Sequence, residues 1–157
     1  MLSQQLTLLL YDAKIQDDTS TLLSLSMERN LKAKQSSNKI SQIHQKYALE
    51  EAEIQNQIDE ISKTRQNGTD ENGNELDSDT KSDLLNQYEE LKGELKDLKN
   101  AEDKEVENVE KESTNYENEN DTEQNQVQTD MQATKEDRDA IKENLDQDIE
   151  KTFGYFQ

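Results

Sequence analysis

The sequence predicts an all-α protein, a long antiparallel helical hairpin that packs as a coiled coil. Its 157 residues include no proline and only four glycines, so little interrupts helix formation. Two of these glycines, Gly68 and Gly73, lie among turn-forming residues in the segment 66–79, where we expect the chain to fold back. On both sides of this segment, apolar residues recur three and four positions apart, which is typical of one helix face. An extra break in either arm would instead give a three- or four-helix bundle.

Apolar residues are too scarce to build a thick globular core. They make up 29% of the chain, against 35% charged residues. A two-helix seam needs only about two apolar positions in seven, which this composition can supply. Low hydrophobicity with high net charge also fits disorder in parts of the chain, whereas the apolar periodicity favours helix elsewhere.

The first helical arm is expected to span residues 1–65, and its start is the most leucine-rich part of the chain. Residues 17–20 contain good N-cap residues, so the arm is either one helix or two. Leucines lie on more than one face, and this apolar surface, wider than one seam, predicts a further partner helix from another copy or another protein. The main stripe includes Leu2, Leu6 and Leu9, and the leucines off this stripe are Leu8, Leu10, Leu22 and Leu25.

A heptad pattern in the second half of this arm predicts the interhelical seam. A matching strip follows the turn segment, and the two strips should pack together. We expect Ile61 to lie opposite Leu84 and Tyr47 opposite Leu98. The predicted seam residues are Ile40, Ile43, Tyr47, Ile54, Ile58 and Ile61 in the first arm, and Leu84, Tyr88, Leu91, Leu95 and Leu98 in the second.

The second arm, residues 80–152, loses its apolar pattern in the middle. Residues 117–126 contain no apolar side chain, so they form either a solvated stretch of continuous helix or a break. In the predicted register they face residues 22–27 of the leucine-rich start. This mismatch predicts self-association or a helical partner. The seam resumes through Val127, Met131, Thr134, Ile141, Leu145 and Ile149.

The C-terminal tip, residues 153–157, is aromatic. It contains both phenylalanines of the chain, and in the predicted register it extends past the N-terminus. The tip either joins copies or folds back on residues 6–10, because terminal aromatics often dock. The predicted assembly residues are therefore Leu6, Leu9, Leu10, Leu22, Leu25, Phe153, Tyr155 and Phe156.

Charge is divided unevenly between the arms. Residues 1–65 hold nine acidic and eight basic side chains, and residues 66–157 hold the other 28 acidic and 10 basic ones. The second part, at net −18, lacks the clustered Lys and Arg that nucleic acid or an anionic membrane would require. Its acidity either keeps the helices soluble or forms a docking surface for a basic partner.

Residues suited to catalysis or metal binding are few. The chain has no cysteine and one histidine, His44, so neither a His-based triad nor a two-His metal site can be built. An EF-hand loop counted from Asp70 would have Glu75 in place of the required glycine and Lys81 in place of the required glutamate. We expect no enzyme activity, no cofactor, no metal site and no small-molecule substrate.

The start of the chain shows neither the basic flank nor the cleavage pattern of a signal peptide, and no apolar run is long enough to span a membrane. These features predict a protein that is cytoplasmic or is exported without a cleaved signal. In general layout the predicted hairpin resembles bacterial appendage subunits of the flagellin and type III secretion filament kind. In those proteins terminal helices pair and a middle segment decorates the outside. This resemblance implies a structural subunit that self-assembles into a helical bundle or filament.

The alternative is an acidic coiled-coil adaptor or chaperone, similar in outline to the two-helix stalk proteins of bacterial export machines, or a scaffold used in phage assembly. In that case the acidic arm would dock a basic partner, and binding would weaken strongly with salt.

Overall fold

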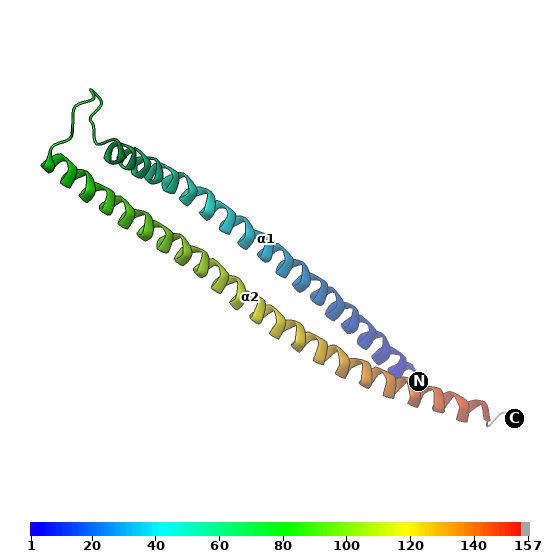
Figure 1. Cartoon of the computed structure of the whole chain (residues 1–157). Coiled ribbons are helices and arrows are strands. Elements are labelled where there is room, and N and C mark those ends of the chain that lie inside the picture. The colour runs from blue at the N-terminus through cyan, green and yellow to red at the C-terminus, as the bar shows by residue number, and fades with distance from the viewer. Residues whose placement is uncertain (155–157) are drawn as a thin grey trace. The chain divides into compact units, whose positions relative to one another are not determined.

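The computed structural model describes residues 1–154 and forms two long helices in that range, α1 (Leu2–Asn67) and α2 (Ser78–Gly154). The helices pack against each other in antiparallel fashion, and a short loop joins them (Figure 1). The predicted all-α helical hairpin is therefore confirmed. Beyond the helices, residues 1–154 contain no β-strand, apart from an isolated bridge between Thr69 and Glu75.

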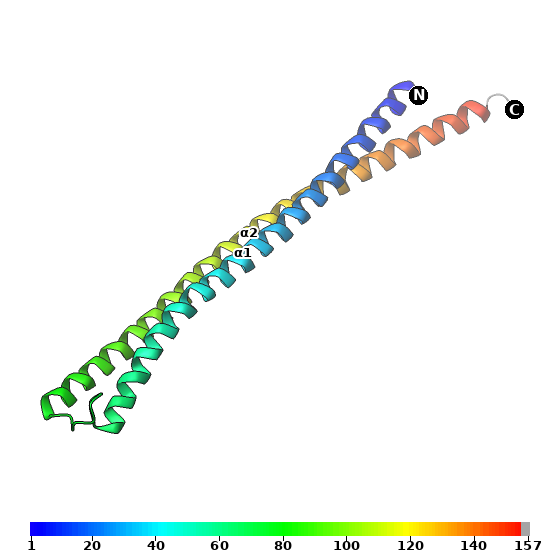
Figure 2. The ribbon, with the colours of Figure 1, turned by 90° about the horizontal axis from the view of Figure 1, so that it is seen from above.

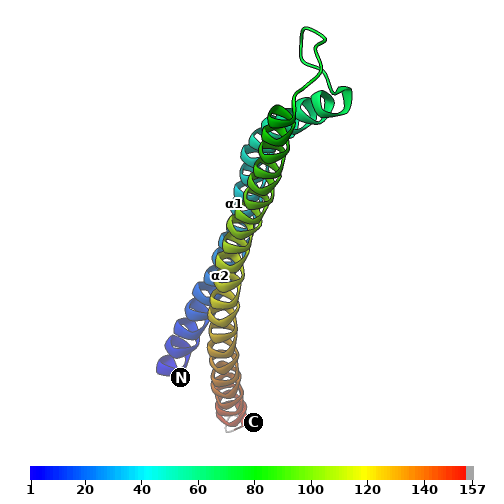
Figure 3. The same ribbon diagram turned by 60° about the vertical axis from the view of Figure 1, so that its left-hand side comes forward.

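The chain divides into two compact units, and each contains a part of both helices. The loop unit is Lys34–Glu112, where the two helices pack against each other and the loop lies at their shared end (Figure 3). The terminal unit combines Met1–Ala33 with Ser113–Gln157, where the start of α1 lies beside the last part of α2 (Figure 2).

Neither helix is broken within its bounds. α1 continues through residues 17–20 and α2 through residues 117–126, so the three- or four-helix alternative does not occur. Hydroxyl groups in these segments bond to the preceding turn instead of capping a new helix. Thr19 Oγ1 donates to the Ile15 carbonyl at 2.8 Å, and Thr122 Oγ1 donates to the Asn118 carbonyl at 2.8 Å.

The loop comprises residues 68–77, two residues shorter at each end than the predicted segment 66–79. Gly68 has φ +67° and stops α1 in the left-handed conformation that favours glycine. At the other end Asp77 caps α2, because its Oδ1 accepts a hydrogen bond from the Thr80 amide at 2.7 Å. Bonds from Thr80 also lower the pKa of Asp77. Each helix therefore gains two residues from the predicted turn.

Hydrogen bonds to Asp70 organise the loop between these ends. Its carboxylate Oδ1 accepts from the amides of Asn72 at 2.9 Å and Asn74 at 2.8 Å, and the bonds from Asn74 and Asn72 hold the pKa of Asp70 below its usual range. Gly73, with φ +81°, completes the turn. The polar residues thus serve the backbone of the loop, as expected for a tight connection.

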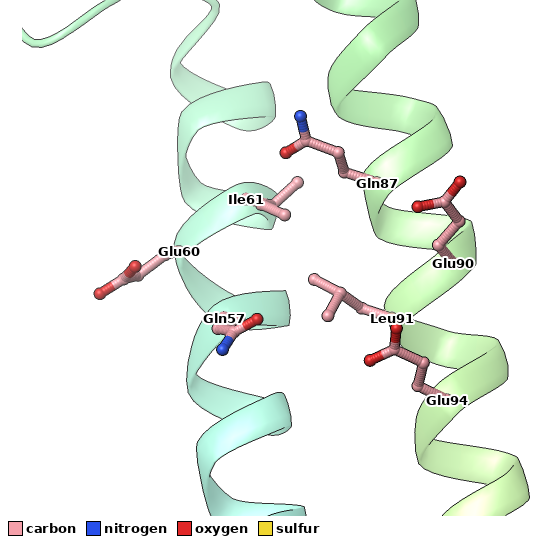
Figure 4. A pocket seen from close by; sticks show the side chains of 7 residues that line it. All are labelled: Gln57, Glu60, Ile61, Gln87, Glu90, Leu91 and Glu94. Carbon is pink, nitrogen blue, oxygen red and sulfur yellow. The ribbon is translucent and has the colours of Figure 1, made fainter.

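The register of the loop unit differs from the predicted one. Tyr47 bonds to Glu105 instead of facing Leu98. Ile61 shares a groove with Leu91, and the two side chains point toward each other from facing helices (Figure 4). Both Glu105 and Leu91 lie seven residues beyond the predicted partners on α2, so the register prediction was wrong at these two positions. A shift of one heptad keeps the same helix faces in contact, and apolar spacing alone cannot detect it.

Candidate functional site

The predicted seam residues of the loop unit all lie on the faces where α1 and α2 meet. Tyr47 and Ile58 are each only 5% exposed, and the other nine are half-buried. A two-helix packing has no deeper layer, so this degree of burial is what a single seam provides. The seam of the loop unit therefore has a structural role, because its apolar side chains are buried or half-buried between the two helices.

Tyr47 links the seam to an acidic side chain. Its phenol donates to Glu105 Oε1 at 2.5 Å, and this bond, together with burial and nearby carboxylates, raises the pKa of Tyr47 to about 12. On the next turn His44 Nδ1 lies 2.6 Å from Glu102 Oε1. This contact with His44 lowers the pKa of Glu102. Tyr47 and His44 thus each link α1 to α2, which is a structural role that needs no substrate.

Tyr47 is expected to titrate about two pH units above an ordinary tyrosine. The unfolded phenol ionises near pH 10, whereas the folded one ionises at about 12, so the stabilisation is complete below pH 10 and is lost as pH rises through 12. Ultraviolet absorbance titration of the wild-type chain minus the Tyr47→Phe chain should show one phenol step near pH 12. A step near pH 10, with helix content intact by circular dichroism, would contradict the bond to Glu105.

The terminal unit buries polar as well as apolar side chains. Asn120 is 4% exposed, its Nδ2 donates to the Leu25 carbonyl at 2.9 Å, and its Oδ1 accepts from Gln124 at 2.6 Å. Next to it, Asp121 pairs with Arg29 at 2.8 Å. The polar segment 117–126 faces the leucine-rich start of α1 as predicted, and two of its ten side chains, Asn120 and Asp121, bond to α1, which reduces the expected mismatch.

Further polar contacts join the helices toward the chain ends. Lys14 Nζ donates to Thr134 Oγ1 at 2.9 Å, and Arg138 pairs with Asp12 at 3.2 Å. Sequence reasoning missed these contacts, as it missed Asn120, because polar residues do not contribute to an apolar stripe. Asp12 and Lys14 are exposed and flank the inward positions Tyr11 and Ile15, so the apolar spacing carries no signal for them.

The leucine-rich start of α1 packs against α2 with the face opposite to the predicted one. The inward stripe of α1 includes Leu8, Tyr11 and Ile15, all half-buried, whereas the expected main stripe through Leu2, Leu6 and Leu9 is exposed. The reason is that α1 is one continuous helix. Leu25 faces α2, and Leu8, Tyr11 and Ile15 lie on the same heptad stripe as Leu25, so this stripe also faces inward. The exposed large apolar side chains in Met1–Ala33 are Met1, Leu2, Leu6, Leu9, Leu10, Leu23, Met27 and Leu31, each between 57% and 81% exposed.

The predicted assembly residues separate into three groups. Leu6, Leu9 and Leu10 are exposed, as is Phe153 near the end of α2. Leu22 and Leu25 are corrections, because Leu22 is half-buried and Leu25 is 8% exposed, both on the inward stripe against α2. Tyr155 and Phe156 lie outside the described residues. The candidate assembly surface is thus the exposed side of α1 in the terminal unit.

Residues 1–154 bring together no group of three or more His, Asp or Glu side chains in positions to hold a metal ion. Neither helix, over its described length, has a segment apolar enough to cross a membrane. Comparison with known proteins assigns no family, since no family model, no curated protein and no solved structure matches the chain. The pattern of exposed and buried residues is therefore the basis for a functional proposal.

Proposed function

We propose that this chain is a non-enzymatic structural subunit that self-associates through its helices into a bundle or filament. The observation that carries the proposal is the exposed apolar surface at the start of α1. Eight large apolar side chains lie there within 31 residues, each at least 57% exposed. Water-facing apolar surface on this scale marks interaction sites in soluble proteins.

The remainder of the described surface supports an assembly role more than a chemical one. The grooves along the helices are lined mainly by Glu, Gln, Asp and Asn, as in the one shown in Figure 4. Such grooves lack the apolar enclosure with a few convergent polar groups that is typical of ligand sites. A bundle or filament subunit of the bacterial appendage kind would use the same paired helices with the loop as decoration.

The runner-up is an acidic coiled-coil adaptor, chaperone or scaffold of a secretion or phage assembly machine. One observation favours it: residues 66–157 carry a net charge of −18, with 28 acidic and 10 basic side chains. A basic partner would bind this surface by electrostatic attraction, and raising the salt concentration would weaken that binding. The exposed apolar side chains of α1 would then meet the partner protein instead of another copy.

Light scattering across protein concentration tests the proposal. We expect the mass of the intact chain to rise above 18.2 kDa as concentration increases. A matched chain ending at Lys151 separates the two predicted assembly regions, because it keeps the α1 surface and lacks the aromatic tip. Growth in both chains assigns assembly to α1, and growth lost with the tip assigns it to residues 152–157. A mass that stays at 18.2 kDa throughout would reject self-association and favour the adaptor.

A further inference from the structure

The exposed apolar surface of α1 has a coiled-coil spacing of its own. We call it the outer face: Leu2, Leu6, Leu9, Ala13, Gln16, Ser20, Leu23 and Met27, all exposed. Successive members are four and three positions apart without exception, which is a heptad repeat over four heptads. The inward stripe has the same spacing, with Leu8, Tyr11 and Ile15 among its members. At 100° per residue the two stripes lie roughly 160° apart.

A helix with two heptad stripes on opposite sides can pack against two helices at once. In the terminal unit α2 occupies one stripe of α1, as the Asn120–Leu25 and Arg138–Asp12 contacts record. The periodicity of the outer face therefore fits a helix as its occupant, because a sheet or a loop has no matching repeat.

Charge indicates which helix fits the outer face. Residues 1–33 hold four acidic and three basic side chains, whereas residues 113–157 hold twelve acidic and four basic ones. If two copies met through α2, their acidic surfaces would repel each other. If they meet through α1, nearly neutral surfaces join and the acidic segments lie on the outside of the assembly.

The amount of apolar surface is sufficient for such a contact. A leucine presents roughly 100 Å² of apolar surface, as transfer free energies per unit area imply. Five large side chains belong to the outer face, each 59–81% exposed, and together they offer roughly 330 Å² per copy. A specific interface at the lower end of the standard range buries about 600 Å² per partner, of which about 57% is apolar, and this corresponds to a similar apolar area.

We propose that the outer face of α1 pairs with the same face of a second copy in antiparallel orientation. This inference rests on the proposed self-association and specifies its surface and partner. In the antiparallel pairing with heptad layers in register, the contacts between copies are Leu2 with Met27, Leu6 with Leu23, Leu9 with Ser20, and Ala13 with Gln16. The two leucine-rich ends of the outer face then cover each other.

The antiparallel orientation also follows from charge. In a parallel pair, the positions flanking the seam would bring Asp12 of each copy toward Asp17 of the other, a like-charge contact made twice. In the antiparallel pair Asp12 faces Thr19 and Asp17 faces Leu10. The helix dipoles of the two α1 segments also oppose each other in this orientation, which is favourable.

The first test changes one outer-face residue and one matched control in the full chain. Leu23→Asp should weaken dimerisation at least about a hundredfold, because each dimer would bury two carboxylates. Leu49→Asp makes the same change at a residue that is 76% exposed but lies in the loop unit, and it should leave dimerisation unchanged. Leu23 is 63% exposed, so its replacement leaves the hairpin folded, as circular dichroism can verify.

The outcomes separate this inference from the proposed function. If wild-type protein is monomeric at every concentration, the proposed function itself fails. If wild-type protein associates and Leu23→Asp associates equally well, self-association stands and the outer face is rejected as its surface. Loss of association in Leu23→Asp alone, with Leu49→Asp unaffected, supports the outer face.

Orientation is tested by disulfide trapping, which the absence of native cysteine makes specific. An L6C chain and an L23C chain, distinguished by a mass tag, are mixed and oxidised. The antiparallel pairing predicts a disulfide between the two different chains in excess of either homodimer, since residues 6 and 23 share one layer. Homodimers in excess of the mixed species would overturn the antiparallel pairing in favour of a parallel one.

Discussion

Replacing Ile58 by Ala should lower the free energy of unfolding by about 3 kcal/mol. Ile58 is 5% exposed in the seam of the loop unit, and few other side chains of this chain are as well covered. A two-helix seam has no second layer that could move in to fill the space, so the cavity and the lost apolar burial both reduce stability. Chemical denaturation followed by circular dichroism measures the change.

The control for this prediction is Leu49→Ala. It removes a similar amount of apolar side chain from the same helix at a position that is 76% exposed. We expect the free energy of unfolding to change by no more than about 0.5 kcal/mol, as for most surface substitutions. Equal effects of the two substitutions would show that the seam of the loop unit does not bury Ile58, and the structural account of that unit would be wrong.

Replacing Asn120 by Leu is expected to raise the stability of the terminal unit by about 2 kcal/mol, the free energy of burying a leucine side chain. Asn120 is buried and its hydrogen bonds to Leu25 and Gln124 replace bonds that it would make with water, so their net contribution is small. A buried asparagine in a coiled coil fixes register at the expense of stability, and its loss should also allow pairing shifted by one heptad.

Thermal unfolding and native-state hydrogen exchange of the Asn120→Leu chain test this expectation. The matched control is Asn125→Leu, the same change at an exposed position on the same helix. The control should change stability little, while Asn120→Leu should increase protection from exchange in the terminal unit. If Asn120→Leu instead lowers stability as Ile58→Ala does, the bond to the Leu25 carbonyl makes a larger net contribution than expected here.

Much of the fold could be predicted because helix faces follow from spacing. The steps of three and four among Ile54, Ile58 and Ile61 identify the buried side of α1 in the loop unit, and burial of Ile58 agrees. The positions of Gly68 and Gly73 identify the turn, since both need positive φ. The exact helix ends could not be predicted, because capping by Asp77 depends on local hydrogen bonds.

The register between α1 and α2 could not be predicted from the apolar pattern. A heptad repeat is unchanged by a shift of seven residues, so Leu84 and Leu91 were equally suitable partners for Ile61 by apolar pattern. The choice between them depends on polar contacts such as Tyr47 with Glu105, which involve distances that spacing does not contain.

The sequence predicted exposed leucines near the N-terminus, but not which leucines are exposed. The excess of leucines near the N-terminus indicated an assembly surface, yet Leu25 lies inward and the stripe through Leu2 and Leu9 lies outward. The start of α1 carries two heptad stripes of similar hydrophobicity, so the apolar pattern does not tell which of them faces α2. The inward one was hidden by its polar members, Asp18 and Arg29 among them, and the pairing of Arg29 with Asp121 is visible only in the folded chain.

We propose that copies of this chain associate through apolar surface and not through charge. Sedimentation equilibrium of the wild-type chain at low and high salt tests it most directly. Association through the outer face of α1 predicts a mass near twice 18.2 kDa that is maintained or increased at high salt, because screening weakens repulsion between acidic segments. Growth beyond twice that mass would indicate a second contact of the kind a filament requires. A chain that remains at 18.2 kDa at both salt concentrations would contradict the account.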